Sequence, residues 1–429
     1  MKRASSTAVP PRKSKKIRLA DRTGVNAGAI GDLDSFKGSA RPSAITSKPM
    51  RKTPAPKAET PGHATSSGSG ARGRPWTVTV ALPGSVVDNA QTHELRSTLV
   101  GQVARACAIF NVDEIVVFSS ADDSGPPPNA AAVDESSSAR RSKRTDGSVF
   151  MARLLQYLEC PQYLRKHIFP VHPDLRHVGL LAPLDAPHHL RIDEACEYRE
   201  AVVVTPGASA TGATRKDSSG EGEGAGDKGA AAADSAESSV SSSVYTGLRK
   251  ELKIGRALPV GTRVTLRMPG PESSNARLGN VVPPREPREA LGYYWGYEVR
   301  LAKGLAAVWS ECPYSGGYDV SIGTSEHGKS VLAHGSGGSH GTAEGAAEWT
   351  MPPFHHLLIV FGGVEGLEPV VAAEDDIAEC EDDVSSLFDQ YLNLCPNQGS
   401  RTIRTEEALL VGLSALKPHI ERAGWECST

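Results

Sequence analysis

Two segments near the end of the chain constrain its fold most. The first is LLIVFGG (Leu357–Gly363), a continuous apolar run that ends in two glycines. Such a run is typical of a strand buried on both faces of a parallel sheet and followed by a tight turn. The second is CPNQGSRTIRTEEALLVGLSAL (Cys395–Leu416), a polar loop leading into an amphipathic helix with Thr405 as the expected N-cap. Ligands bind where parallel strands end, so the two loops predict a site for a small polar ligand.

Earlier segments predict the remainder of an α/β core. WTVTVALP (76–83) and EIVVF (114–118) read as strands, and the helix between them carries an apolar stripe that begins at Leu95. A further helix is expected over 150–158, before Pro161. Short basic runs between 197 and 282 are typical of a small inserted antiparallel barrel. The strands of the core resume at 295–302 and 318–325.

Low-complexity stretches divide the chain. They are rich in Ser, Gly, Pro, Ala and charge, and we expect them to be disordered because they offer little apolar surface to bury: residues 1–72, 119–147, 206–243 and 329–348. The expected parts are therefore a disordered basic arm (1–72), the first part of the core (73–195), the β insert with its disordered 206–243 (196–290), and the second part of the core (291–429).

The amino-terminal arm is strongly basic. Residues 1–74 hold 16 Lys and Arg against four acids, although the whole chain has a net charge of −3. Such an arm favours polyanions such as RNA, and Pro10–Arg18 fits a nuclear-localisation signal. A solvated tail without a specific partner is the alternative. No apolar run is long enough to span a membrane, and the seven cysteines include no C-x-x-C pair, so we expect neither a membrane span nor a structural metal site.

Ordered motifs along the chain resemble those of the SPOUT (SpoU–TrmD) methyltransferases. GQVARACAIFNVDEIVVF (Gly101–Phe118) is similar to the family's first motif, a helix-borne arginine followed by a strand. Further similar motifs follow in the family's order: YLECPQYLRK, LAPLDAPHH, YDVSIGTSEHG, VFGG and NQGSRTIRTEEA. The pattern resembles the eukaryotic and archaeal subgroup that has a basic OB-like insert and includes a human centromere- and spindle-associated protein.

The resemblance implies a parallel sheet whose carboxyl-terminal segment forms a trefoil knot, usually in a homodimer. It also implies S-adenosyl-L-methionine as the cofactor, held by loops after three elements. The residues that would hold it are Thr324, Ser325, Glu326, Gly362, Gly363, Gln398, Gly399, Ser400, Thr402, Ile403 and Thr405. Glycines let backbone approach the ligand closely. An ordinary tight turn is the alternative for Gly362 and Gly363.

Three residues are candidates for the chemistry. By resemblance, Arg105 would orient a phosphate of the target or stabilise its developing charge. The sequence departs from the family at Leu99, where many members have asparagine, which favours a base nitrogen over a ribose oxygen as the target. Arg404 and Glu406 would bind RNA or assist proton removal. A structural arginine and an intrahelical charge network are the alternatives.

The implied function is transfer of a methyl group to RNA in the nucleus or nucleolus, with a uridine N3 of ribosomal RNA as the expected target. The cations that would contact RNA are Arg72, Arg74, Arg249, Lys250, Lys253, Arg263, Arg267 and Arg401. The charges of the insert fit a solvated structural module equally well. A non-catalytic scaffold that binds RNA or the spindle and centromere remains the alternative function.

Overall fold

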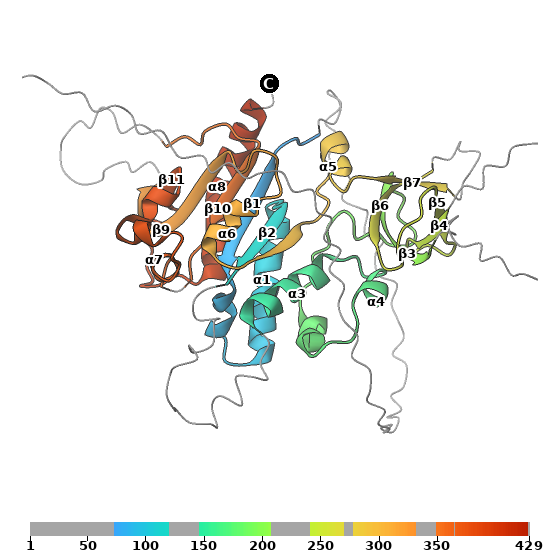
Figure 1. Cartoon of the computed structure of the whole chain (residues 1–429), viewed down its shortest axis with the longest axis horizontal. Helices are drawn as coiled ribbons and strands as arrows, with labels where there is room; N and C mark the ends of the chain where they lie inside the picture. The colour runs from blue at the N-terminus through green and yellow to red at the C-terminus, as the bar shows by residue number, and fades with distance from the viewer. Residues whose placement is uncertain are drawn as a thin grey trace, which may run out of the picture. The chain divides into compact units, whose positions relative to one another are not determined.

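The core of the protein is a parallel sheet. The computed structural model describes residues 73–119, 146–206, 241–269, 278–331, 349–363 and 365–427. All neighbouring strands of the sheet are parallel, and apolar residues pack on both faces, as such sheets require. In spatial order the strands are β11 (Gln390–Asn393), β9 (Val320–Ser330), β10 (His356–Val360), β1 (Thr77–Pro83), β2 (Glu114–Phe118) and β8 (Glu298–Ala302) (Figure 1).

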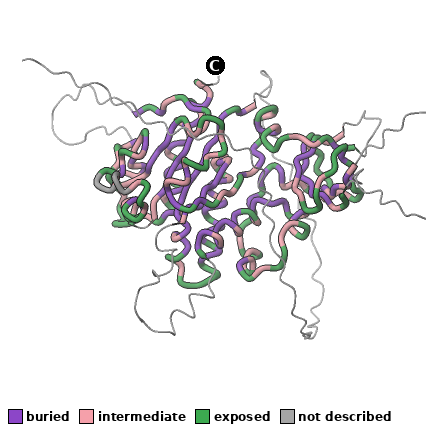
Figure 2. The backbone as a smooth tube through the Cα atoms, viewed as in Figure 1, coloured by how far each residue is buried: buried purple, intermediate pink, exposed green. Residues whose placement is uncertain are grey.

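Helices cover the sheet on both sides. Alternate residues of each strand face opposite layers, so Val80 packs into one cluster with the long helices and Ala81 into the other. The first layer contains η1 (Gly84–Asn89), α1 (His93–Ile109), α3 (Gly147–Glu159), η3 (Pro173–Leu180) and α8 (Thr405–Glu426). The second contains α6 (Leu305–Ser310), α7 (Glu368–Ala372) and η4 (Ala378–Leu387). Two short helices lie outside these layers, α4 (Arg165–Ile168) and α5 (Glu286–Leu291). Buried residues concentrate along the central strands (Figure 2).

A closed five-stranded barrel is inserted between η3 and α5. Its strands follow the order β3-β4-β5-β7-β6, and β3 and β6 pair to close it. All pairs are antiparallel except β5 with β7. The strands are β3 (Tyr198–Thr205), β4 (Ser242–Tyr245), β5 (Leu252–Ile254), β6 (Arg263–Arg267) and β7 (Leu278–Val282). The predicted parallel α/β core with an inserted β-barrel is therefore confirmed.

Several boundaries differ from the sequence-based expectations. Leu95 is 54% exposed, because the buried face of α1 runs through Arg96, Val100 and Val103. β4 begins at Ser242, inside the segment 206–243 expected to be disordered, because its Ser-rich sequence hides the strand. β9 continues to Ser330, past the expected end at 325. The basic arm with Arg72, and most of the low-complexity stretches, lie outside the described residues. No helix in the described ranges is long and apolar enough to cross a membrane.

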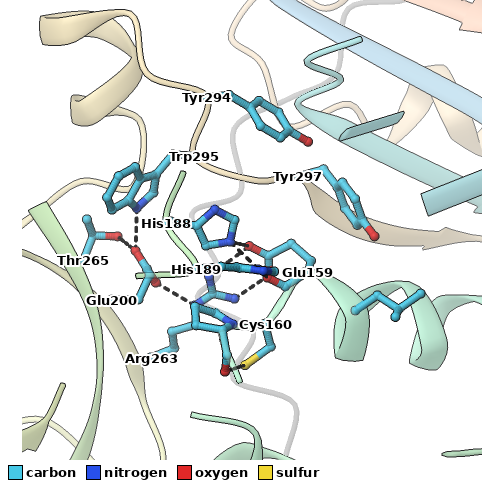
Figure 3. A network of polar contacts seen from close by, with 12 residues as sticks. Glu159, Cys160, His188, His189, Glu200, Arg263, Thr265, Tyr294, Trp295 and Tyr297 are labelled. Carbon is cyan, nitrogen blue, oxygen red and sulfur yellow. Dashed lines mark hydrogen bonds and ion pairs between the residues drawn. The ribbon is translucent and has the colours of Figure 1, made fainter. Parts of the chain in front are cut away.

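A buried network of charges joins the barrel to the core (Figure 3). The Arg263 guanidinium donates two hydrogen bonds, of 2.5 and 2.9 Å, to the carboxylate of Glu159 at the end of α3. Its Nε donates to Glu200 of β3 at 2.6 Å. Glu200 also accepts from Thr265 Oγ1 at 2.6 Å and from Trp295 Nε1 at 2.7 Å. One arginine therefore neutralises a carboxylate from each part of the fold.

Two adjacent histidines complete this network. Nε2 of His188 lies 2.9 Å from Glu159 Oε1 and 3.0 Å from the Glu159 carbonyl oxygen, so it carries the proton. Nε2 of His189 donates to the same carbonyl at 2.7 Å. Burial, followed by the neighbouring His188, lowers the pKa of His189 to about 4, so His189 is neutral at pH 7. Both histidines thus bind Glu159, through its backbone carbonyl oxygen and, for His188, also through its carboxylate.

We predict that Glu159→Gln destabilises the fold in a pH-dependent way. Burial alone raises the pKa of the Glu159 carboxyl, but Arg263 and the hydrogen bond from His188 outweigh it and hold that pKa well below the usual value of 4.5. A depressed carboxyl pKa stabilises the fold above the unfolded-state value, and this stability is lost as the pH falls through the folded-state value. Breaking a buried ion pair is strongly destabilising, but Arg263 is 30% exposed. We therefore expect the variant to lose about 3 kcal/mol of unfolding free energy at pH 7, which is the low end of the range for buried pairs.

Urea unfolding of the wild type and the variant at pH 7, 5 and 3.5 measures this loss. The difference in unfolding free energy should stay constant from pH 7 to 5 and shrink at pH 3.5. Glu251→Gln, which removes an exposed carboxylate of the barrel, is the control and should change little. A difference that persists unchanged at pH 3.5 would contradict the assigned ionic role of Glu159.

Candidate functional site

A cavity of about 540 Å³ opens at the carboxyl ends of β10 and β11 and beside the middle of β9. These strands are neighbours in the sheet, so three loops that are distant in sequence converge there. The walls come from 324–327, from 361–369 and from 392–411. A volume of this size is typical of sites for small molecules. The sequence prediction that the loop after LLIVFGG lies beside the loop before the terminal helix is confirmed.

One wall is an arch in the middle of β9. β11 pairs with β9 as far as Gly323 and resumes at Lys329, so the residues between them leave the ladder. Thr324 Oγ1 donates to the carbonyl oxygen of Val360 at 3.0 Å. Asn393 Nδ2 donates to the Glu326 carbonyl oxygen at 2.8 Å. These two bonds fix the arch to both neighbouring strands and present Thr324, Ser325 and Glu326 to the cavity.

A glycine turn after β10 forms the second wall. The amide of Gly363 donates to the carbonyl of Gly366 at 3.1 Å, and the reverse bond measures 3.2 Å. Gly366 has φ +88°, in the left-handed region that favours glycine. A Cβ on Gly362 would lie 2.6 Å from the carbonyl carbon of Gly366. The turn therefore requires glycine at Gly362, and its backbone lies directly on the cavity wall.

The third wall is the segment that enters α8. Thr405 is buried, and its hydroxyl donates to the carbonyl oxygen of Gly362 at 3.0 Å. Thr405 was expected to be the N-cap, but the helix begins at Thr405 and Arg404 is the cap, with its amide donating to Glu407 Oε2 at 3.1 Å. The hydroxyl thus serves as a tie between the helix and the glycine turn. The terminal segment is thereby held against the end of β10.

Most of the residues predicted to hold the cofactor lie on this cavity. Those on its walls are Thr324, Ser325, Glu326, Gly362, Gly363, Gln398, Thr402, Ile403 and Thr405. Gly399 and Ser400 belong to the same loop but do not line the cavity. Ser400 instead donates to the carbonyl oxygen of Thr402 at 2.7 Å, which shapes the loop.

The charges on the walls are mainly acidic. Glu326, Glu365 and Glu368 line the cavity together with one arginine, Arg401. Glu368 accepts from the amide of Leu367 at 2.9 Å and so braces the glycine turn. Among the described residues, Arg401 has no ion pair or side-chain hydrogen bond, and it is exposed. Its guanidinium is available to a ligand, and the surrounding carboxylates favour a ligand that carries positive charge.

The three residues predicted to be catalytic lie outside this wall. Arg105 Nη1 donates to the carbonyl oxygens of Leu184 at 2.8 Å and Pro183 at 3.2 Å. These contacts join two of the motifs that the sequence singled out. Arg404 and Glu406 stand at the start of α8, next to the wall residue Thr405, without lining the cavity themselves.

The predicted RNA-binding cations fall into two groups. Arg249, Lys250 and Lys253 are exposed on the barrel around β5. In contrast, the guanidinium of Arg263 is occupied by Glu159 and Glu200.

Two other predicted cations are also engaged with acids. Arg74 forms a buried ion pair with Asp113, in which Nη2 and Oδ1 lie 2.6 Å apart. Arg267 is half-exposed and pairs with Glu286 at 2.5 Å. These arginines neutralise acids within the fold, so the available cations of the barrel lie around β5.

Some wall residues were not predicted from the sequence. β11 is only four residues long, and QYLN carries no clear strand pattern. The walls that it and the glycine turn supply include Glu365, Gly366, Glu368, Leu392, Asn393, Leu394 and Cys395. The only signal in the sequence is that Leu392 and Leu394 stand on either side of Asn393, and this alternation is too short to be distinctive.

The protein is therefore of the α/β class, with a parallel sheet, a small-molecule cavity beside its strands and an inserted barrel. The family described as "Putative RNA methyltransferase" matches residues 77–416, which include the whole sheet, the barrel and the cavity walls. The chain belongs to this family.

Its relatives include proteins with a named activity. The chain is 46% identical over 355 residues to the human 28S rRNA (uridine-N(3))-methyltransferase, covering 82% of this chain and 81% of the human protein. The mouse protein of the same name is 44% identical over 355 residues, covering 82% of this chain and 79% of the mouse protein. A Drosophila melanogaster protein of that name is 39% identical over 359 residues, covering 81% of this chain and 63% of the fly protein.

We predict that Gly362→Ala destabilises the protein and Gly399→Ala does not. The added Cβ at Gly362 meets backbone that cannot move aside cheaply, whereas at Gly399 nothing lies within 4 Å. Overpacking costs about 1–3 kcal/mol, which should appear as a lower melting temperature by calorimetry. Equal melting temperatures for the two variants would show that the glycine turn is not as tight as its geometry indicates.

Proposed function

We propose that this protein transfers a methyl group from S-adenosyl-L-methionine to N3 of a uridine in ribosomal RNA. The family membership and the 46% identity to a human 28S rRNA (uridine-N(3))-methyltransferase support it most directly. The cavity beside β9, β10 and β11 supports the same function from geometry, because it lies within the matched region and has the size of a cofactor site.

The residues of the cavity fit the cofactor. At Gly362 and Gly363 the wall carries no side chain, so a ligand can approach the backbone closely. The acidic walls, with Glu326 and Glu365, suit a sulfonium cation. S-adenosylmethionine would be held by the β9 arch, the glycine turn and the loop before α8. When bound, it supplies an electrophilic methyl group.

We propose two further features of the fold. The terminal segment would form the trefoil knot of SPOUT proteins, and the bond of Thr405 to the Gly362 carbonyl supports a close passage past β10. The barrel would be an OB-like module. Its strand order, with antiparallel closure of β3 on β6 and the parallel pair β5–β7, supports this assignment.

The chemistry requires removal of a proton from the uridine. N3 carries a hydrogen and becomes a good nucleophile only after that proton has left. We propose that the Arg401 guanidinium stabilises the resulting uridine anion, because it lines the cavity and has no partner among the described residues. An exposed carboxylate of the wall, Glu326, would accept the proton. Arg105, held by the carbonyls of Pro183 and Leu184, would position RNA rather than react.

The exposed cations around β5 would supply the main RNA contact of the barrel. Three exposed cations lie on or next to this strand: Arg249, Lys250 and Lys253. Among the described residues they form no ion pair that RNA binding would have to break. Phosphate contacts of this kind are sequence-independent and weaken with salt. They would position RNA, while the cavity selects the target base.

We also propose a homodimer in the nucleus. On α8, Leu410 is 46% and Val411 38% exposed, and Val411 lines the cavity. Adjacent exposed apolar residues at the mouth of a site suit a partner subunit. The basic segment Pro10–Arg18, which lies outside the described residues, supports nuclear import.

Calorimetry and label transfer test the proposed function directly. Wild-type protein should bind S-adenosylmethionine and transfer its labelled methyl group to ribosomal RNA, with 3-methyluridine as the product in nucleoside mass spectrometry. Binding without 3-methyluridine would disprove the target. The absence of cofactor binding in folded protein would favour a non-catalytic scaffold.

We predict that Arg401→Ala lowers methyl transfer by about 10–100-fold while leaving cofactor binding within a few-fold, because it removes a charge aimed at the reacting base. Raising the pH should partly restore the variant, since more uridine is then deprotonated without help. Arg401→Lys should retain an intermediate rate. The rates are measured in single-turnover assays from pH 6.5 to 9. Parallel pH profiles for Arg401→Ala and wild type would rule out this role.

A further inference from the structure

A second cavity, of about 500 Å³, lies between the sheet and the barrel. It opens at the amino ends of β1, β2 and β8, so it lies at the opposite edge of the sheet from the first cavity. Thr77, Asp113 and Glu298 line it from the core, and Glu200 and Thr265 from the barrel. It is thus built by both parts of the fold and shares no wall residue with the first cavity.

Flat rings form part of its wall. Trp295 is held in place by its Nε1 bond to Glu200 (Figure 3) and by an edge contact with Tyr198. Tyr314 stacks on His356 with ring centroids 4.1 Å apart and planes at 9°. The exposed parts of Trp295 and Tyr314 give the cavity wall aromatic, apolar surface. Fixed aromatic surfaces of this kind stack nucleobases.

Most charges around the cavity are already paired. Glu159 and Glu200 share Arg263. Asp113 is neutralised by Arg74 at 2.6 Å, with Arg288 at 3.8 Å. These groups hold the walls together and are not free to bind a ligand.

Two charged groups on the wall remain available. Within the described parts of the chain, the Glu298 carboxylate has no hydrogen bond or ion pair. Glu298 is exposed at the start of β8. Arg285 is 69% exposed, and its Nε lies 3.7 Å from Glu289, a weak surface pair. An acceptor on the wall and a cation at the mouth are therefore both open to a ligand.

We propose that this second cavity binds a guanine nucleotide of the RNA substrate, with Glu298 on the base and Arg285 on the phosphate. Guanine alone among the four bases presents two adjacent N–H donors on its Watson–Crick edge, at N1 and N2, and a carboxylate offers two matching acceptors. Adenine and cytosine present one donor beside an acceptor, which a carboxylate repels. Uracil presents a single donor between two carbonyl oxygens. That the nucleotide belongs to the RNA substrate rests on the proposed function. The preference for guanine is inferred from the residues of this cavity alone.

Mononucleotides test the preference without any methyl transfer. Ligand-observed NMR at pH 8 measures binding of guanosine, inosine and uridine 5′-monophosphates to the full chain. We expect guanosine monophosphate to bind at least about tenfold more tightly than inosine monophosphate, which lacks the N2 amino group. Glu298→Gln should abolish that difference. Arg285→Ala should weaken guanosine monophosphate but leave guanosine unchanged.

Glu94→Gln, an exposed substitution on α1 remote from both cavities, should bind as the wild type does. Melting temperatures confirm that the variants fold, and hydrogen exchange of 283–298 should slow with guanosine monophosphate. No binding to wild type, or an unchanged preference in Glu298→Gln, would overturn the inference. Calorimetry with S-adenosylmethionine on the same samples tests the first cavity independently, so one proposal can fail while the other stands.

Discussion

The structure depends on the parallel pairing of β11, β9 and β10. Parallel strands end at the same edge of a sheet, so the chain must return three times to that edge and leave three loops beside one another. The hydroxyl of Thr405 then ties the last loop to the glycine turn through the Gly362 carbonyl. Residues that are 80 positions apart in sequence, from the arch at Ser325 to Thr405, meet at one cavity because of this constraint.

The sequence pattern predicts an element well where burial of its apolar residues alone determines the structure. LLIVFGG reads as a buried parallel strand because both faces must be apolar, and β10 confirms it. Leu409, Leu413 and Leu416 identify the buried face of α8 by spacing. The loops beside these elements carry most of the predicted cofactor residues, and the structure brings them to one cavity.

The remaining features of the fold depend on contacts between segments that are far apart in the sequence, and the sequence pattern does not show those contacts. Arg263 resembles a surface cation in a basic strand, yet Glu159, 104 positions earlier, occupies it. Leu95 matches the apolar stripe of α1 but falls at the edge of the buried face. β4 and β11 are only four residues long, and each is a strand because a neighbour supplies its ladder. Contacts between distant segments determine the structure of these residues and strands, and the local sequence pattern contains no information about such contacts.

The two cavities lie at opposite edges of one sheet, and this separation sets a minimum length for any molecule that contacts both. β1 alone has seven residues, which at about 3.3 Å each measures roughly 20 Å from edge to edge. That span equals about six stacked nucleotides at 3.4 Å each. A single nucleoside is too short to span the distance between the two cavities. An RNA that occupies both must therefore reach around the sheet as a loop or stem of several nucleotides, and the protein would select substrates by the length of that loop or stem.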